Sequence, residues 1–145
     1  MKVEIRIQGF DPWAELTAYQ QSLAVRKGGF GATAVFIGTM RDFNQDTAIA
    51  AMTLEHYPGM TEKHLEEIAH EARSRWAILD LLVLHRVGQL QPNEPIVLCA
   101  VWSAHRRGAF AACRFLIEEL KSRAPFWKKE RTENGEHWVE HNSAG

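Results

Sequence analysis

Two long apolar runs, separated by a short polar segment, constrain the fold of this chain more than any other feature. Residues 79–87 and 96–102 are rich in Leu, Val and Ile, and neither run contains glycine or proline. Gly88 and the turn at residues 91–94 separate them. Runs of this length that are bounded by turn residues are typical of β-strands. We therefore predict a β-hairpin.

The other strand signals are distributed along the whole chain. Residues 3–7 alternate apolar and charged side chains, which predicts a half-buried edge or antiparallel strand. The apolar run at residues 32–39 predicts a central strand, and residues 52–56 and 137–140 predict short strands. The glycine-rich residues 28–31 precede a strand, whereas a phosphate loop follows one, so we interpret them as a turn or mobile lid.

Helix signals occur in three places. Asp11 and Pro12 predict an N-cap and a first helical residue for a helix over residues 13–23. Thr61 is the predicted cap of a second helix, over residues 61–76, and a third helix is predicted over residues 106–123. The apolar stripe of this third helix, which we expect to pack inward, consists of Phe110, Cys113, Ile117 and Leu120.

The composition limits the class of protein. A chain of 145 residues with 46% hydrophobic and 24% charged residues fits one globular domain, which we place at residues 1–145. We predict an α+β fold: a mostly antiparallel sheet with two to three packed helices. The net charge of -1 and the absence of a long apolar run predict a cytoplasmic protein that binds neither nucleic acid nor membrane.

The cysteine and histidine patterns do not predict a metal site or a bound cofactor. Cys99 and Cys113 lie within apolar patterns, so we expect both in the core. The sequence contains neither a CxxC nor an HExxH pattern. We therefore expect no metal, no cofactor and no disulfide framework.

One segment near the C-terminus predicts a reactive amine. Residues 120–130 place Lys121 and Lys128 on either side of a break at Pro125, beside Phe126 and Trp127. Burial and neighbouring cations can lower the pKa of a lysine by several units, which makes its amine a usable base or nucleophile. Taken alone, the same residues are also compatible with solvated charges that follow a helix.

Two further clusters predict anion binding. Residues 103–107 lie where a strand leads into a helix, so free backbone N–H groups converge with the side chains of His105 and Arg106. Cations at a helix N-terminus oppose the helix dipole, which favours a nearby anion, although a simple helix cap with solvated side chains is the alternative. Arg41 follows the strand at residues 32–39, where a loop can present it from a rigid scaffold.

Five separated segments occur together in the order and spacing of one known family, and the similarity covers roughly residues 30–139. They resemble the large, catalytic subunit of molybdopterin synthase. This resemblance implies an α/β hammerhead-like fold. The segments are residues 38–44, 54–60, 84–88, 103–106 and 120–130.

The resemblance implies a sulfurtransferase of molybdenum cofactor biosynthesis. Members of the family insert two sulfurs into cyclic pyranopterin monophosphate and thereby form the dithiolene of molybdopterin. The sulfur arrives as a thiocarboxylate on the C-terminal Gly-Gly tail of a small ubiquitin-like subunit. The implied assembly is a homodimer of large subunits with a small subunit at each end, which makes a heterotetramer.

The resemblance also assigns roles to residues at matching positions. It implies that Lys121 and Lys128 are the catalytic lysines. It further implies that the pocket for the anionic substrate and the partner's tail is shaped by Arg41, His105 and Arg106.

Glu130 is a supporting candidate, because its carboxylate can pair with a lysine and change the pKa of that lysine.

Two alternatives to the enzyme come from other classes of protein. One is a non-catalytic binder that holds an acidic or C-terminal peptide tail in the same cationic cleft. The other is an RNA-binding or phosphate-binding domain that uses Arg106 and Arg107 with the aromatic rings of Phe126 and Trp127. The net charge of -1 counts against the RNA-binding alternative.

Overall fold

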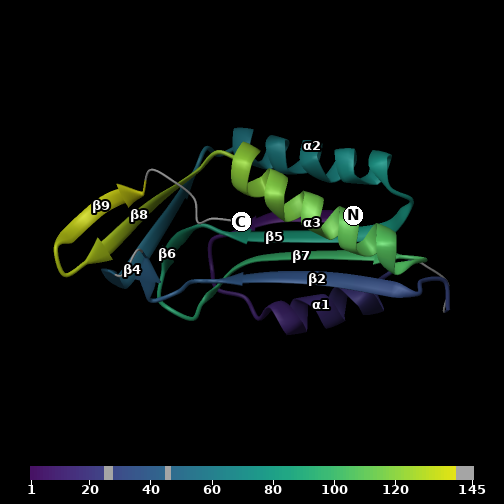
Figure 1. The fold of residues 1–145 in the computed structure, drawn as a ribbon, viewed down its shortest axis with the longest axis horizontal. Helices are drawn as coiled ribbons and strands as arrows, with labels where there is room; N and C mark the ends of the chain where they lie inside the picture. Colours follow the sequence, from purple (N-terminus) through teal and green to yellow (C-terminus); the bar gives the residue numbers. More distant parts are fainter. Residues whose placement is uncertain (25–27, 45–46, 140–145) are drawn as a thin grey trace.

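The computed structural model describes residues 1–24, 28–44 and 47–139. In these residues, two β-sheets follow one another along the long axis of the molecule, and three α-helices pack against the first of them (Figure 1). Within the described residues, the pairing of β1 with β5 is parallel and every other strand pair is antiparallel. The predicted α+β class with a mostly antiparallel arrangement is therefore confirmed.

The first sheet has the strand order β1-β5-β7-β2. β5 and β7 are antiparallel and almost completely buried, so the predicted hairpin is confirmed as the centre of this sheet. β1 is an edge strand, as predicted, and it runs parallel to β5. The four strands are β1 (Lys2–Arg6), β5 (Ile78–Arg86), β7 (Pro95–Ser103) and β2 (Ala32–Thr39).

β2 is an edge strand, and our prediction of a central strand was wrong. In the sheet order it has β7 as its one neighbour. Its apolar side chains are not all covered, since Val35 is 37% and Phe36 is 39% exposed. An apolar run indicates that a strand is buried, but it does not indicate which element or chain covers it. An edge strand that is covered by another chain therefore has the same sequence pattern as a central strand.

The second sheet lies at one end of the first sheet, at the left of Figure 1. β4 extends the strand predicted at residues 52–56, and β9 contains most of the strand predicted at residues 137–140, whose last residue lies outside the described residues. β8 was not predicted. The strands are β3 (Phe43–Asn44), β4 (Thr47–His56), β8 (Phe126–Thr132) and β9 (Gly135–Val139), and β6 (Gly88–Leu90) also pairs with β4.

The helices cover both faces of the first sheet: α2 (Met60–Arg75) and α3 (Arg106–Arg123) lie on one face and α1 (Pro12–Gln21) on the other (Figure 1). The predicted cap of α1 is confirmed, because Oδ1 of Asp11 accepts a hydrogen bond from the backbone N–H of Trp13 at 3.0 Å. Among the residues that the structure describes, no helix is long and apolar enough to span a membrane.

α2 has a different cap from the one predicted. The N-cap is Gly59 at a φ of 85°, and its backbone N–H donates to the Glu62 carboxylate at 3.0 Å. Thr61 lies within the helix, where its Oγ1 accepts a hydrogen bond from the Tyr57 N–H at 2.9 Å and donates one to the Pro125 carbonyl at 3.1 Å. Thr61 thus connects the start of α2 to the start of β8.

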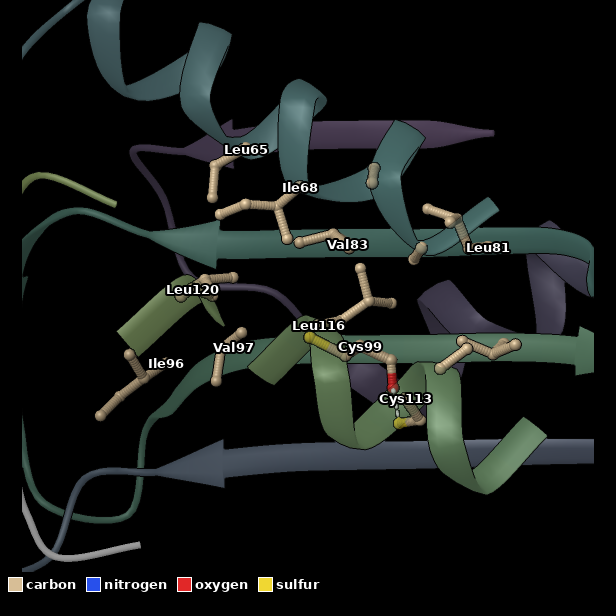
Figure 2. Close-up of a cluster of buried hydrophobic side chains, with 14 of the residues drawn as sticks. Leu65, Ile68, Leu81, Val83, Ile96, Val97, Cys99, Cys113, Leu116 and Leu120 are labelled. Atoms are coloured by element: carbon tan, nitrogen blue, oxygen red, sulfur yellow. Dashed lines mark hydrogen bonds between the residues drawn. The ribbon is translucent and has the colours of Figure 1, made fainter. Parts of the chain in front are cut away.

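α3 has the predicted boundaries and packs on β5, β7 and β2, and Figure 2 shows its Leu116 and Leu120 directed toward the sheet. Phe110, which we expected in the core, is 69% exposed. Cys99 and Cys113 are buried free thiols, as predicted, and the Cys113 thiol donates to the Cys99 carbonyl at 3.7 Å. The buried residues of α3 are Ala109, Ala112, Cys113, Leu116 and Leu120.

Candidate active site

A cavity of about 350 Å³ lies where the first sheet, the second sheet and the C-terminal end of α3 meet. Its walls combine apolar side chains with a small number of charged ones, which is typical of ligand sites. The charged side chains come from separate elements: Lys121 from α3, Lys128 and Glu130 from β8, and Arg41 from the loop after β2. The other lining residues are Phe36, Ile37, Gly38, Thr39, Met40, Ile49, Met52, Ile96, Val97 and Val139.

Lys121 occupies the last turn of α3, just before Ala124 and Pro125 end the helix. Leu120 beside it is 2% exposed, so this end of the helix is firmly packed, and Lys121 lines the cavity. Burial, with the nearby charge of Lys128 as the second cause, lowers the pKa of Lys121 to about 8. This amine is therefore far closer to neutral at physiological pH than an ordinary lysine.

Lys128 reaches the same cavity from β8, which pairs with β4 on one side and with β9 on the other. Alternate residues of a strand point to the same face, so Lys128 shares the inward face of β8 with Phe126 and Glu130. Burial lowers the pKa of Lys128, and the charge of Arg41 adds to this effect, while Glu130 opposes it.

Glu130 lies in the wall of the cavity and is only 5% exposed. Its Oε2 is 3.8 Å from the Nε2 of His137 on β9. Among the described residues that line this cavity, Glu130 is the one carboxylate, and it faces a set of three cations. The charge of the site is therefore positive, which suits an anionic ligand.

Arg41 is exposed at the mouth of the cavity, directly after Met40, which is 3% exposed. Two backbone hydrogen bonds of 2.9 Å fix Met40 in place, one to the carbonyl of Glu94 and one from the N–H of Asn93. β2 also approaches β7 very closely here, since a Cβ on Gly38 would lie 2.8 Å from Val97. Arg41 is thus presented by a fixed loop, as predicted from its position after the strand.

His105 and Arg106 are not part of this cavity within one chain. They are exposed at the opposite end of α3, where His105 is the N-cap and Arg106 the first helical residue. A helix of 18 residues is about 27 Å long, so it separates these side chains widely from Lys121. The structure brings Arg41, the two lysines and Glu130 together, and it places the other two predicted site residues elsewhere.

His85 also lies at this site, although its sequence pattern did not indicate a role for it. It lies near the end of β5, and its ring stacks on that of Phe126 with 3.9 Å between centroids and 13° between planes. It shares a small cavity of about 20 Å³ with Lys121 and Lys128. The available signal was a titratable side chain on the same strand face as the core residues Leu81 and Val83.

The chain matches known proteins over most of its length. The model of the family described as "MoaE protein" matches residues 12–123. The molybdopterin synthase catalytic subunit of Pseudomonas aeruginosa is 51% identical over 140 residues, which cover 97% of this chain and 91% of that protein.

Solved structures give the same result. The molybdopterin biosynthesis MoaE protein of Burkholderia ambifaria has a TM-score of 0.79 at 48% identity and covers 99% of this chain and 92% of its own. A complex of subunits 1 and 2 of the molybdopterin-converting factor from Helicobacter pylori has a TM-score of 0.79 at 25% identity, with coverages of 97% and 92%. The fold, the lysine-lined cavity and these similarities together establish that the chain belongs to the MoaE family, the family of molybdopterin synthase catalytic subunits.

Proposed function

We propose that this chain is the catalytic subunit of a molybdopterin synthase and that the cavity of about 350 Å³ is its active site. The reaction transfers sulfur from the C-terminal thiocarboxylate of a small ubiquitin-like subunit to cyclic pyranopterin monophosphate. The observation that carries the proposal is the presence of Lys121 and Lys128 in one cavity, where both have lowered pKa values. Perturbed amines in a concave site are typical of catalytic groups.

Lys121 is suited to the proton transfers of this reaction. The thiocarboxylate sulfur displaces an oxygen substituent from a substrate carbon, which joins the tail to the substrate through a thioester. Water then attacks the thioester carbonyl carbon and breaks its bond to sulfur, which leaves a carboxylate on the tail and a thiolate on the substrate. The attacking water loses a proton, and a neutral amine can accept it. With a pKa of about 8, about a tenth of Lys121 is neutral near pH 7.

The charged groups stabilise the negative charges that the reaction brings together. Lys128 faces the same space and can stabilise the oxyanion of the tetrahedral intermediate. Arg41 at the mouth has the planar geometry to hold the substrate phosphate through two hydrogen bonds. Glu130 limits the excess of positive charge and opposes the lowering of the pKa of Lys128.

A second copy of the chain provides a way to bring His105 and Arg106 to the cavity. β2 is an edge strand whose start pairs with Ser103 and whose end, at Thr39, borders the cavity. If two β2 strands pair antiparallel about a two-fold axis, the start of each lies beside the end of the other. His105 of the second copy then approaches Arg41 and Lys121, and the exposed Val35 and Phe36 become covered.

The small subunit supplies the sulfur. The Helicobacter pylori structure to which this chain is similar is a complex of two subunits of the molybdopterin-converting factor. In our proposal, the C-terminal Gly-Gly tail of a ubiquitin-like subunit enters the cavity, where its thiocarboxylate meets Lys121 and Lys128. A tail without side chains can pass a narrow entrance, and the cations of the cavity attract its terminal charge. Each dimer would bind one small subunit at each end.

Reconstitution tests the proposed function. The purified chain is mixed with a thiocarboxylated ubiquitin-like carrier and cyclic pyranopterin monophosphate, and the dithiolene product is measured. We expect product from the wild type and none from Lys121→Ala. The matched control is Lys129→Ala, because Lys129 is the next residue on β8 after Lys128, points to the other face and pairs with Glu136 at 3.1 Å.

The outcomes separate the enzyme from the alternative. Product from the wild type and the Lys129 variant, but not from Lys121→Ala, supports the proposal. Carrier binding without product from any form would instead indicate a non-catalytic binder of a peptide tail. Wild-type turnover by Lys121→Ala would remove this lysine from the mechanism.

A further inference from the structure

His85 is buried and lines a small cavity together with the two lysines. It is 1% exposed and is held between the first sheet and the ring of Phe126, on which it stacks. An apolar ring would fill the same volume without a free-energy cost for burying polar atoms. The two ring nitrogens of a buried histidine need hydrogen-bond partners. One nitrogen lies within hydrogen-bond distance of a backbone carbonyl, which leaves the other for a second partner.

The hydrogen bond of Nδ1 fixes the tautomer of the ring. Nδ1 of His85 lies 2.8 Å from the carbonyl oxygen of Arg86, which can only accept a hydrogen bond. Burial and the nearby charges of Lys121, Lys128 and His56 keep the ring neutral by lowering its pKa to about 3. The proton of the neutral ring is therefore on Nδ1, and Nε2 carries a lone pair that accepts hydrogen bonds.

The surroundings of the ring offer donors to this lone pair. A cavity of about 20 Å³ is lined by His85 together with Lys121 and Lys128. A space of roughly 10–15 Å³ holds one water molecule, so this cavity has room for one. The rest of its wall is apolar and consists of Leu54, Leu120, Ala124 and Phe126.

We propose that His85 is a positioning residue for Lys121, whose amine donates a hydrogen bond to Nε2 of His85 either directly or through one water molecule in the small cavity. The inference rests on the proposed function of Lys121 as the catalytic amine. An amine at the end of a four-carbon stem has many rotamers, and a fixed acceptor reduces them to the one that faces the reacting atoms.

A neutral acceptor has an advantage over a carboxylate at this position. A carboxylate beside the amine would favour the charged ammonium and would raise the pKa of Lys121 toward that of an ordinary lysine. The neutral imidazole orients the amine without adding a negative charge. Among the residues that the structure describes, the other titratable groups that line the larger cavity with Lys121 or act on its pKa are Lys128 and Glu130 of β8, Arg41 after β2, and Cys99 of β7.

The first test uses the unaltered protein. A long-range ¹H–¹⁵N correlation spectrum of the wild type reports which ring nitrogen of His85 carries the proton. We expect the neutral Nδ1–H form from about pH 5 to about pH 9. A protonated Nε2 in this range would leave no lone pair for Lys121 and would overturn the inference.

The second test compares two substitutions of His85. His85→Phe keeps a ring that can stack on Phe126 but removes the acceptor, whereas His85→Gln places an amide oxygen near the position of Nε2. The reactivity of Lys121 toward a small acylating reagent is measured by mass spectrometry as a function of pH, which gives the pKa of its amine. We expect a midpoint near 8 in the wild type, a midpoint about one pH unit lower in His85→Phe, and recovery in His85→Gln.

Turnover provides a separate reading of the same variants. We expect kcat of His85→Phe to fall roughly tenfold or more, with unchanged KM for the sulfur carrier, and His85→Gln to regain most of it. His56→Phe is the matched control, because His56 is another histidine near His85 that lines neither cavity. It should retain the wild-type midpoint of Lys121.

The possible outcomes lead to distinct conclusions. A wild-type midpoint and kcat in His85→Phe would overturn the inference, and so would equal impairment of the Phe and Gln variants. If circular dichroism shows that His85→Phe does not fold, the ¹H–¹⁵N spectrum of the wild type tests the inference on its own, because it reports which ring nitrogen of His85 carries the proton. The acylation midpoint does not depend on sulfur transfer, so failure of this inference is distinguishable from failure of the proposed function.

Discussion

Lys121 and Lys128 enter one cavity from two different elements, and burial together with the charge of Lys128 lowers the pKa of Lys121. The short connection through Ala124 and Pro125 makes this arrangement possible, because α3 ends there and β8 begins at once. The hydrogen bond from Thr61 to the Pro125 carbonyl fixes the connection to α2. The site therefore depends on a helix-to-strand turn as much as on the lysines.

The coupling between the lysines can be measured directly. The Lys128→Gln substitution removes one positive charge near Lys121. The ammonium form of Lys121 is then repelled less, so the pKa of Lys121 should rise above about 8. Burial, the larger cause, remains, so the pKa should stay below that of an ordinary lysine. Acylation of Lys121 as a function of pH gives this value. An unchanged midpoint would show that the two charges do not interact.

Lys121 should make the stability of the fold depend on pH. Its pKa is 10.5 ordinarily and about 8 in the folded chain, so the unfolded chain holds more protons between these values and stability rises with pH there. Below about pH 8, Lys121 is charged in the folded chain, so the full free-energy cost of burying its charge lowers the stability of the fold. Lys121→Met should therefore be more stable than the wild type near pH 7 by about 1–3 kcal/mol, and the difference should shrink above pH 8. Urea unfolding of both proteins across this range measures it; a difference independent of pH would contradict the assignment.

Arg41 should act through its shape as well as its charge. Arg41→Lys keeps the positive charge but loses the two parallel donors, so we expect KM for cyclic pyranopterin monophosphate to rise roughly tenfold with a smaller change in kcat. Steady-state kinetics with varied substrate provide the test. The control is Arg131→Lys, because Arg131 lies on the outward face of β8 and is exposed. Equal effects of the two changes would argue against specific phosphate binding by Arg41.

Mixed dimers test whether two chains share each site. Lys121→Ala and His105→Ala are each expected to be inactive alone. When the two variants are refolded together, half of the dimers combine one chain of each kind, and one site in each such dimer has an intact Lys121 from one chain and an intact His105 from the other. Mixing should restore about a quarter of wild-type activity. If each site uses one chain only, no activity returns.

The exposed edge of β2 gives an independent test of the same assembly. Val35→Lys places a charge where the second copy is expected to pair, so the dimer should dissociate while the monomer remains folded. Light scattering after gel filtration measures the mass, and circular dichroism reports the fold. Glu66→Lys, at an exposed residue of α2 near β1 and the opposite edge of the sheet, is the control and should leave the dimer intact. A wild-type chain that is monomeric at all concentrations would refute the assembly.

The sequence predicted the central part of the fold well, since strong local signals coincide with the tertiary contacts there. The hairpin of β5 and β7 consists of apolar runs that are buried on both faces, and α3 is bounded by a strand before it and by Pro125 after it. The edge position of β2 could not be predicted, because its apolar residues indicate burial but not the partner that provides it.

β8 was missed for a physical reason that concerns the site itself. Its inward face carries Lys128 and Glu130, and its outward face carries Trp127, so the usual alternation of apolar inward and polar outward residues is reversed in part. A strand that lines a charged cavity does not have the pattern of a core strand. The lysines were found from their surroundings in the sequence, whereas the strand that holds one of them was not.

The length of α3 sets a geometric limit on change in this protein. One end of the helix carries His105 and the other carries Lys121, and each successive residue of an α-helix turns by about 100°. Inserting a single residue in α3 would swing Lys121 by that angle, away from the cavity and into solvent or the core, while only slightly changing its distance from His105. Variation in length is therefore expected in the loops, and α3 should tolerate substitutions on its exposed face but neither insertions nor deletions.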